Sequence, residues 1–333
     1  MKKIFVIAVA ALSLAALSAQ AATTIKFGSL APIGSPWDTA LKRISADWTK
    51  VSAGEVVLKI YSGGIAGDEP DMIRKVKLGQ LDAVGLTGFG LTWLDPAIMS
   101  MQVPLLIRTE AELDYILAKM TSFYEASLEQ KGYKVLFWTK VGWAHFFSKK
   151  PVVTPDDLKK CKLFVWEGSA DEIRVWKKDG FNPVPLPGTE VMTALQSGMI
   201  DSLTTSPLTA AAYQWFGLAP NMCGMKWAPF VGAMLVSLKA WNSLTPELRA
   251  KLLDSAHRIG GSMQADIAGA DAKAMDVMKQ YGLKVNPVPP AVVEQWAAMV
   301  NNGFVADLGG KMFDKEVYEK IKALLAEYRK SGK

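Results

Sequence analysis

The sequence predicts an α/β fold made of two units, each built around a largely parallel sheet. Strand-like and helix-like segments alternate through the first half of the chain, as they do in βαβ folds. A second series of the same kind begins near Pro151. The chain has 333 residues, more than one hydrophobic core usually supports. These observations together predict two packed units rather than one.

The first series opens with a strand over residues 25–30 and a helix whose start is well marked. Ser35 is a suitable N-cap, and Pro36 occupies the first helical position. Strands follow over 56–61, 83–86 and 134–138, and Thr109 with Glu112 predicts a capping box before another helix. The first helix has one apolar face, formed at helical spacing by Trp37, Leu41, Ile44, Trp48 and Val51.

The second series contains a strand over 162–166, a helix opened by a capping box of Ser169 and Glu172, and a strand near 200–203. Beyond it, apolar positions continue at helical spacing from Pro246 toward Tyr281. A helix of roughly 35 residues would span over about 50 Å at the usual rise, which is enough to lie across both units. Three glycines within it, Gly260, Gly261 and Gly269, are expected to bend it.

The N-terminus has the pattern of a cleaved secretory signal peptide over residues 1–21. Lys2 and Lys3 precede a short apolar run, and Ala19-Gln20-Ala21 resembles a cleavage site. Cleavage would remove both lysines and no acidic residue, so the net charge would fall from +6 to +4. This weak, dispersed charge predicts no nucleic-acid partner, and the signal peptide predicts a periplasmic location.

Residues that commonly carry catalysis or metal binding are few. The chain has two histidines, His145 and His257, and no motif of a zinc, phosphate-loop or serine-hydrolase site. We therefore expect no enzyme activity, no metal and no cofactor. Cys161 and Cys223 either pair or remain as buried free thiols, and the sequence leaves both alternatives open.

Several ordered segments resemble the substrate-binding subunits of TRAP transporters, the DctP-like periplasmic solute-binding proteins. The resemblance covers nearly the whole chain after residue 21. Its motifs are Leu30-Ala31-Pro32-Ile33-Gly34-Ser35-Pro36-Trp37, Tyr61 to Gly67 with Asp71-Met72-Ile73, Leu78-Gly79-Gln80-Leu81-Asp82, Val103-Pro104-Leu105-Leu106, Thr154-Pro155-Asp156-Asp157-Leu158-Lys159, Asn182-Pro183-Val184-Pro185, and Glu190-Val191 with Thr193 to Asp201.

The resemblance implies a two-lobe periplasmic binding protein fold, with mixed and largely parallel sheets, hinge strands, and a long helix across both lobes. The first lobe is expected to hold residues 22–148 and about 229–258, and the second 149–228 and about 280–330, with the long helix over about 246–281. A membrane permease is the implied partner, and some relatives work with an additional helical-repeat periplasmic protein. The ligand would be held between the lobes, which close on it.

The chain departs from the family pattern at the positions that hold an acidic ligand. Two arginines that meet the ligand carboxylate are replaced by Phe164 and Ala144, and two polar positions by Thr205 and Thr87. Because an anion loses its hydration in a closed cleft, a cleft without these arginines predicts a neutral or hydrophobic ligand. The candidate ligand-binding residues are Trp37, Thr87, Phe89, Trp143, Ala144, His145, Phe164, Trp166, Thr205, Ser206 and Trp227.

Two alternatives to this interpretation stay open. An acid could still be held by another cation, such as Lys140, Lys149 or Arg174, or by a recruited metal ion. The protein could instead be a periplasmic interaction module that no longer serves transport.

Overall fold

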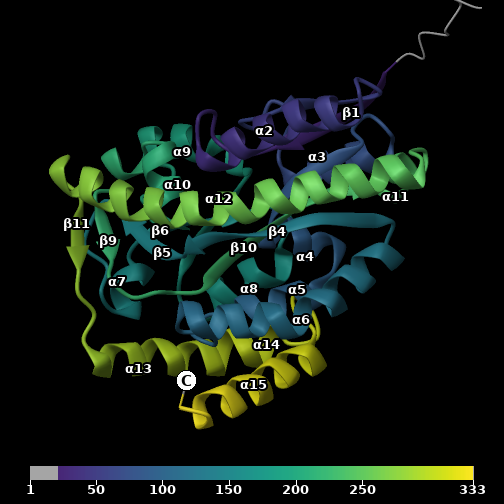
Figure 1. The fold of residues 1–333 in the computed structure, drawn as a ribbon. Helices are drawn as coiled ribbons and strands as arrows, with labels where there is room; N and C mark the ends of the chain where they lie inside the picture. Colours follow the sequence, from purple (N-terminus) through teal and green to yellow (C-terminus); the bar gives the residue numbers. More distant parts are fainter. Residues whose placement is uncertain (1–21, 333) are drawn as a thin grey trace, which may run out of the picture.

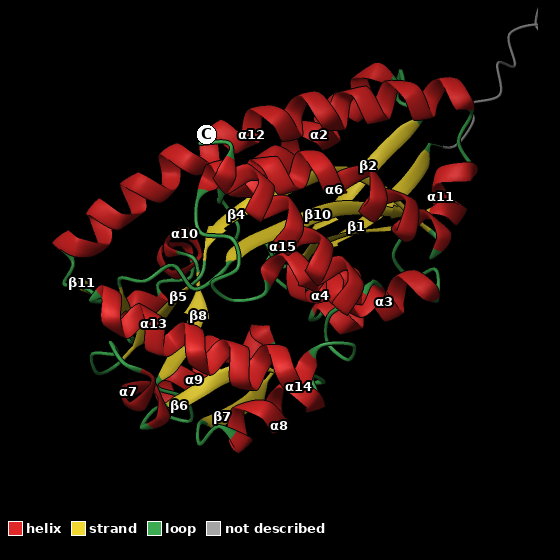
Figure 2. Cartoon of the chain, turned by 90° about the horizontal axis from the view of Figure 1, so that it is seen from below, coloured by secondary structure: helices red, strands yellow, loops and turns green. Residues whose placement is uncertain are grey.

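Two β-sheets form the framework of the protein, and each is the centre of one lobe (Figure 1, Figure 2). The computed structural model describes residues 22–332, so the predicted signal peptide lies outside the described residues. The first sheet has the strand order β2-β1-β3-β10-β4 and the second β11-β9-β5-β8-β6-β7. The strands are β1 (Thr23–Ser29), β2 (Val56–Tyr61), β3 (Ala83–Thr87), β4 (Tyr133–Trp143), β5 (His145–Ser148), β6 (Lys162–Trp166), β7 (Asn182–Leu186), β8 (Ser202–Thr205), β9 (Asn221–Cys223), β10 (Pro229–Ser237) and β11 (Lys284–Asn286).

Both sheets are mixed, which confirms the predicted fold class. β1 pairs in parallel with β2 and β3, whereas β10 runs antiparallel to β3 and β4. In the second sheet β6 is parallel to β7 and β8, and β5 is antiparallel to β8 and β9. The antiparallel strands β4, β5 and β10 belong to the segments that pass from one sheet to the other.

Helices cover the faces of both sheets. They begin largely where capping residues predict; α2, for example, has Ser35 as N-cap, and its hydroxyl accepts a hydrogen bond from the Asp38 amide. The helices are α2 (Pro36–Val51), α3 (Glu69–Lys77), α4 (Gly88–Leu94), α5 (Pro96–Met99), α6 (Glu110–Gln130), α7 (Pro155–Lys159), α8 (Ala170–Lys178), α9 (Val191–Ser197), α10 (Pro207–Ala212), α11 (Leu238–Asn242), α12 (Pro246–Gln280), α13 (Pro290–Met299), α14 (Ala306–Leu308) and α15 (Lys315–Lys330), with short 3-10 turns η1 (Ser100–Gln102), η2 (Gly188–Glu190) and η3 (Trp215–Gly217) and a π-helical turn η4 (Val300–Val305).

The two chain segments that cross between the sheets are hydrogen-bonded to each other. The backbone N–H of Ala144 donates to the Ala228 carbonyl, and the N–H of Trp227 donates to the Ala144 carbonyl, each at 2.8 Å. Two such bonds at the crossing hold the segments side by side, as expected of hinge strands.

The long helix α12 has 35 residues and lies along both lobes (Figure 1). In the first lobe, the Trp48 indole N–H donates to the Leu252 carbonyl at 3.0 Å. Near the other end, Asp271 accepts from the Leu208 backbone N–H in α10 at 3.1 Å. α12 continues through its three glycines as one unbroken helix. A Cβ at Gly260 would lie 2.7 Å from the Phe137 ring, so this glycine permits close packing.

Four clusters of buried apolar side chains form the core. Two lie on opposite faces of the first sheet, and two lie around the second. Cys161 and Cys223 are both buried, and both thiols are free. Among the described residues, no helix is both long and apolar enough to cross a membrane.

The packing of α15 bears on where the lobes divide. Its side chains Val317 and Ile321 join the cluster that contains α6, and Arg329 donates to Glu112 of α6 at 2.7 Å. The lobe boundaries remain a proposal, and this packing favours assigning α15 to the first lobe rather than the second.

One predicted capping box differs in the structure. Ser169 is the N-cap of α8, but its side chain accepts no backbone hydrogen bond. Glu172 instead accepts from the indole N–H of Trp176, one turn further along the same helix, at 3.2 Å. The aromatic partner at i+4 therefore competes successfully for this carboxylate.

Candidate functional site

A cavity of about 360 Å³ lies between the lobes and is lined by both sheets. This volume is within the range of about 300–1,000 Å³ that is usual for small-molecule sites. Phe27 and Met234 of the first sheet contribute to its wall, as do Phe164 and Leu203 of the second. The wall draws residues from all four apolar clusters, so a molecule in the cavity would contact both lobes.

Seven of the eleven predicted ligand-binding residues line this cavity. They come from five separate segments of the chain, which the two sheets and their loops bring together. They are Trp37, Thr87, Phe89, Phe164, Trp166, Thr205 and Trp227.

The other four predicted residues do not line the cavity and have identifiable structural contacts. The Trp143 indole N–H donates to Glu110, and Lys226 lies over the Trp143 ring, 4.6 Å from its centroid. Ala144 is fully buried in the crossing segment described above. His145 Nδ1 lies 2.9 Å from the Cys223 carbonyl oxygen, and burial lowers the pKa of this histidine. Ser206 is the N-cap of α10, and its hydroxyl lies 2.8 Å from the Thr209 hydroxyl.

Aromatic rings close the cavity at the contact between the lobes. Phe89 lies in the first turn of the short helix α4 of the first lobe. Its ring stacks on Trp166 of β6 in the second lobe, with centroids 4.9 Å apart. Phe164 meets Trp166 edge to face at 5.6 Å. Because β6 alternates its side chains between two faces, Phe164 and Trp166 lie on the same face of the sheet.

Two hydrogen bonds also join the lobes beside the cavity. Asp68, the N-cap of α3, accepts from the backbone N–H of Gly188 at 2.9 Å. Tyr213 is the residue that follows α10, and Leu30 is the residue that follows β1. The Tyr213 hydroxyl donates a hydrogen bond to the Leu30 carbonyl. Together with the aromatic contacts, these bonds define a closed arrangement of the lobes.

Two glutamates are the ionisable acids of the cavity wall. Glu69 accepts from the Thr87 backbone N–H at 2.5 Å and from the Thr87 hydroxyl at 2.8 Å. Burial raises the pKa of Glu69 to about 7, although the bonds from Thr87 act in the opposite direction. Burial likewise raises the pKa of Glu172, whereas the Trp176 indole N–H and the nearby Ser169 hydroxyl act in the opposite direction. Both carboxyl groups therefore hold a proton more readily than carboxyl groups in water.

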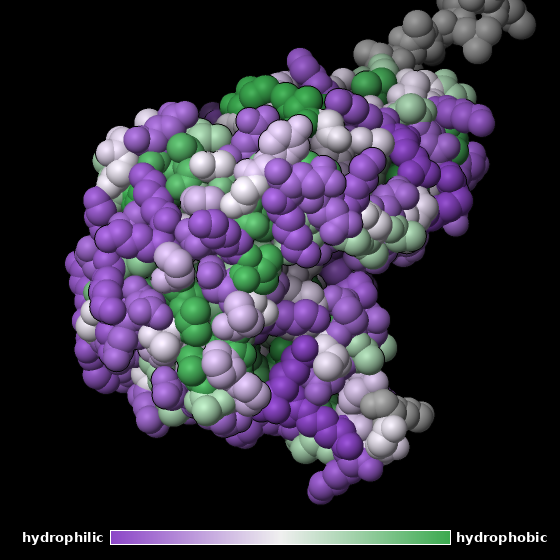
Figure 3. Space-filling view, turned by 90° about the vertical axis from the view of Figure 1, so that its left-hand side faces the viewer, coloured by the Kyte–Doolittle hydropathy of each residue, from purple (hydrophilic) through white to green (hydrophobic). Residues whose placement is uncertain are grey.

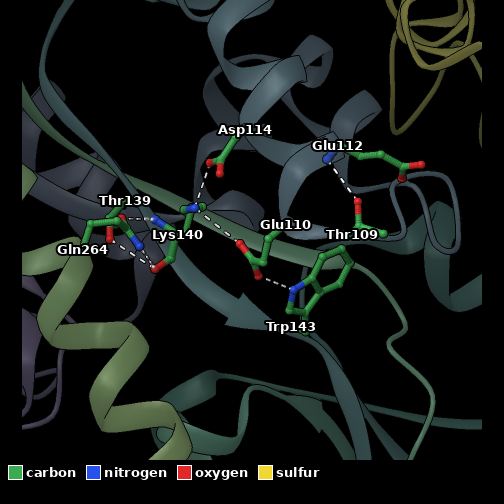
Figure 4. A network of polar contacts seen from close by, with 8 residues as sticks. All are labelled: Thr109, Glu110, Glu112, Asp114, Thr139, Lys140, Trp143 and Gln264. Atoms are coloured by element: carbon green, nitrogen blue, oxygen red, sulfur yellow. Dashed lines mark hydrogen bonds and ion pairs between the residues drawn. The ribbon is translucent and has the colours of Figure 1, made fainter. Parts of the chain in front are cut away.

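No lysine, arginine or histidine within residues 22–332 contributes to the cavity wall. The three cations considered as alternative acid-binding groups have other contacts. Lys140 donates to Asp114 at 2.8 Å and to Glu110 at 3.3 Å, and the Lys140 backbone is bonded to Gln264 of α12 (Figure 4). The Lys149 ammonium donates to the Leu195 carbonyl at 2.8 Å.

The third of these cations, Arg174, lies on the outer side of α8. It pairs with Asp171 of the same helix at 3.0 Å. Hydrophilic side chains also cover most of the outer face in Figure 3, where the apolar residues form separate patches. The charged groups of the molecule thus lie mainly outside the cavity. Among the described residues, no three His, Cys, Asp or Glu side chains form a metal-binding group.

Sequence reasoning missed several residues of the cavity wall. Glu172 was interpreted only as a capping residue, and Met263 lies in the predicted long helix but was not singled out. Tyr213, Trp215 and Phe304 also line the cavity and were not singled out. Phe304 lies in the π-helical turn over Val300–Val305, a type of turn that often occurs at functional sites but has no simple sequence pattern.

Two α/β lobes, joined by crossing segments and enclosing a cavity, define a two-lobe solute-binding protein. The model of the DctP family, bacterial extracellular solute-binding protein family 7, matches residues 27–304, and the chain belongs to this family. Members of the family are solute-binding proteins of TRAP transporters rather than enzymes.

Individual relatives bind acidic solutes. The 2,3-diketo-L-gulonate-binding periplasmic protein YiaO of Escherichia coli is 29% identical over 285 residues, which cover 85% of each chain. The sialic acid-binding periplasmic protein SiaP of Vibrio cholerae is 23% identical over 86% of this chain and 89% of that protein. A TRAP solute-binding protein from Xanthobacter autotrophicus, crystallised with β-D-galacturonate, superimposes with a TM-score of 0.81 at 24% identity, covering 90% of this chain and 99% of that one.

Proposed function

We propose that this chain is the extracytoplasmic solute-binding subunit of a TRAP-type transporter and that its ligand is a small, uncharged and largely apolar organic molecule. The observation that carries the proposal is the composition of the cavity wall. It combines Phe, Trp, Leu and Met side chains with two carboxyl groups, and it includes no basic residue of the described chain.

The electrostatics of such a wall disfavour an anion. A carboxylate that leaves water needs a partner of opposite charge or several hydrogen-bond donors, and without them the cost is several kcal/mol. Here the nearest ionisable groups, Glu69 and Glu172, would repel it when ionised. Phe164, which the resemblance places where acid-binding members have an arginine, is 7% exposed and lines the cavity. The apolar wall instead favours a ligand that gains free energy by leaving water.

Transport function and location follow from the family and from the N-terminal sequence. We propose that residues 1–21 direct the protein to the periplasm, where a membrane permease receives the ligand. A helical-repeat periplasmic partner stays a prediction, and co-purification from the native host tests it.

Binding of an organic acid is the second candidate, favoured by relatives such as YiaO and SiaP. It would require Lys140, Lys149 or Arg174 to leave its present partner, or a metal ion to enter the cavity. Each of these steps costs free energy that the binding of an uncharged ligand does not require.

Mass spectrometry of the compounds released on denaturing the protein, purified from its native host, tests the proposal. We expect an uncharged compound of low polarity. A sugar acid, a dicarboxylate or a sialic acid as the released compound would contradict it. Melting temperatures measured with galacturonate and succinate provide a second readout, because a ligand of the native state raises the melting temperature; we expect no increase.

A further inference from the structure

Polar side-chain atoms that are buried without a hydrogen-bond partner are concentrated in residues that line the cavity. Within residues 22–332 seven such atoms occur, and four of them belong to residues that line the cavity: Trp37 Nε1, Gln102 Nε2, Glu172 Oε2 and Trp215 Nε1. Native proteins satisfy the great majority of their buried polar atoms, so unpaired atoms at one wall indicate a partner that the empty cavity lacks.

Glu172 is the acceptor in this set. Its Oε1 is held by the Trp176 indole at 3.2 Å, whereas Oε2 has no partner. Glu69, the other glutamate of the wall, differs because Thr87 satisfies both of its oxygens. The last side-chain torsion angle of a glutamate, χ3, has a broad and roughly two-fold distribution. A modest rotation about this bond can therefore present a Glu172 oxygen to the cavity.

The three remaining atoms are N–H donors, and they narrow the chemistry of the ligand. A hydroxyl group both donates to a carboxyl oxygen and accepts from an N–H group. An ammonium group has no acceptor to offer the indoles, and a carboxylate has no donor to offer Glu172. A pure hydrocarbon would leave all four atoms unpaired.

We propose that Glu172 is a specificity-determining residue that accepts a hydrogen bond from a hydroxyl group on an uncharged, largely apolar ligand. The N–H groups of Trp37, Gln102 and Trp215 are buried and unpaired in the present arrangement, and small side-chain rotations would let them meet oxygen atoms of the same ligand. This inference rests on the proposed function, because it assumes that the cavity takes an uncharged molecule.

A matched series of probes on one carbon skeleton tests it: menthol, menthyl methyl ether, menthane, menthylamine and menthane carboxylate. Their affinities are measured by calorimetry for the wild type, for Glu172→Leu and for Asp171→Asn. Asp171 is the matched control because it precedes Glu172 on α8 but is exposed and pairs with Arg174.

We expect the wild type and Asp171→Asn to bind menthol about tenfold or more tightly than the methyl ether, as a hydrogen bond to a charged or buried carboxyl implies. In Glu172→Leu the ratio should fall about tenfold or more, because the acceptor is lost while the ether's extra bulk affects both proteins alike. If Glu172→Leu does not fold, Glu172→Gln keeps one acceptor oxygen and should show an intermediate ratio.

The outcomes separate this inference from the proposed function. Equal binding of menthol and its ether by the wild type, or a preference retained in Glu172→Leu, would overturn the role of Glu172 while leaving an apolar ligand in place. Tightest binding of menthylamine would overturn the hydroxyl assignment. Tightest binding of the carboxylate, or no binding of any probe, would overturn both proposals.

Discussion

Phe89 and Trp166 lie face to face where the two lobes meet, with ring centroids 4.9 Å apart and ring planes inclined by 18°. Phe89 belongs to α4 of the first lobe and Trp166 to β6 of the second. Since both rings line the cavity, their contact couples closure of the lobes to the shape of the site.

The stack is expected to stabilise the closed arrangement. Stacked aromatic pairs contribute about 0.5–1.5 kcal/mol beyond the area that they bury. A double-mutant cycle of Phe89→Ala and Trp166→Ala, measured by urea unfolding, should therefore give a coupling free energy of that size. Pairing Trp166→Ala with Phe123→Ala is the control, because Phe123 contacts Tyr124 of α6 instead. A coupling near zero for Phe89 and Trp166 would show that the lobes do not close through this contact.

Placing a cation in the cavity should change its selectivity. In Phe164→Arg a guanidinium replaces a ring that is 7% exposed, so we expect a loss of stability on the order of 3 kcal/mol without an anion. Galacturonate should then raise the melting temperature of the variant but not of the wild type. Phe123→Arg changes a side chain that is 41% exposed, so it is the control. It should leave the free energy of unfolding and the response of the melting temperature to galacturonate nearly unchanged. If the wild type binds galacturonate and Phe164→Arg binds it less well, the argument from charge is wrong.

Two neighbouring glycines of α12 should respond in opposite ways to alanine. A Cβ at Gly260 would lie 2.7 Å from Phe137, so Gly260→Ala should lower the free energy of unfolding by about 1–3 kcal/mol. At Gly261 the added methyl meets no atom within 4 Å, so Gly261→Ala should raise it by about 0.4–1 kcal/mol. Urea unfolding of both variants measures the difference, and equal effects would contradict the close contact between α12 and β4.

The stability of the protein should fall as the pH rises toward 7, in part because of Glu69. Its pKa in the folded state is about 7, above the ordinary 4.5, so the folded protein binds this proton more tightly than the unfolded chain. The resulting stabilisation is complete below about pH 4.5 and is lost as the pH rises through about 7. Asp68, Glu172 and Asp271 have pKa shifts in the same direction.

Glu69→Gln isolates the contribution of this residue. The amide can still accept from the Thr87 N–H and donate to the Thr87 hydroxyl, so the local structure should persist. Unfolding free energies at pH 5 and pH 8 should differ less in Glu69→Gln than in the wild type, by on the order of 3 kcal/mol. An unchanged pH dependence would mean that Glu69 titrates near its ordinary pKa.

Local sequence patterns were sufficient for most of the fold. The strand over 162–166 and the 35-residue helix have nearly the bounds that periodicity and caps predicted. The capping box of Ser169 and Glu172 was wrong, because the i+4 partner Trp176 provides a competing donor. A capping pattern predicts where a helix starts better than it predicts the partner of each side chain.

The candidate site was harder to predict because it depends on which face each side chain occupies after packing. Phe164 and Trp166 share a strand face and both line the cavity, but Leu163 and Val165 of the same strand contribute to its wall as well. Trp143, Ala144 and His145 lie where β4 ends and β5 begins, so the alternation of side chains is interrupted there, and the preceding Gly142 has a φ of 118°. Met263 and Phe304 reach the wall only through contacts between distant parts of the chain, which no local pattern encodes.

The two cysteines have a practical consequence for studying this protein. Both thiols are free and buried, so the folded chain has no covalent cross-link to re-form. A tightly held endogenous molecule can therefore be stripped by complete denaturation in urea, and the polypeptide returned to buffer without an oxidant or a disulfide isomerase. The empty protein obtained in this way is the proper starting material for measurements of affinity.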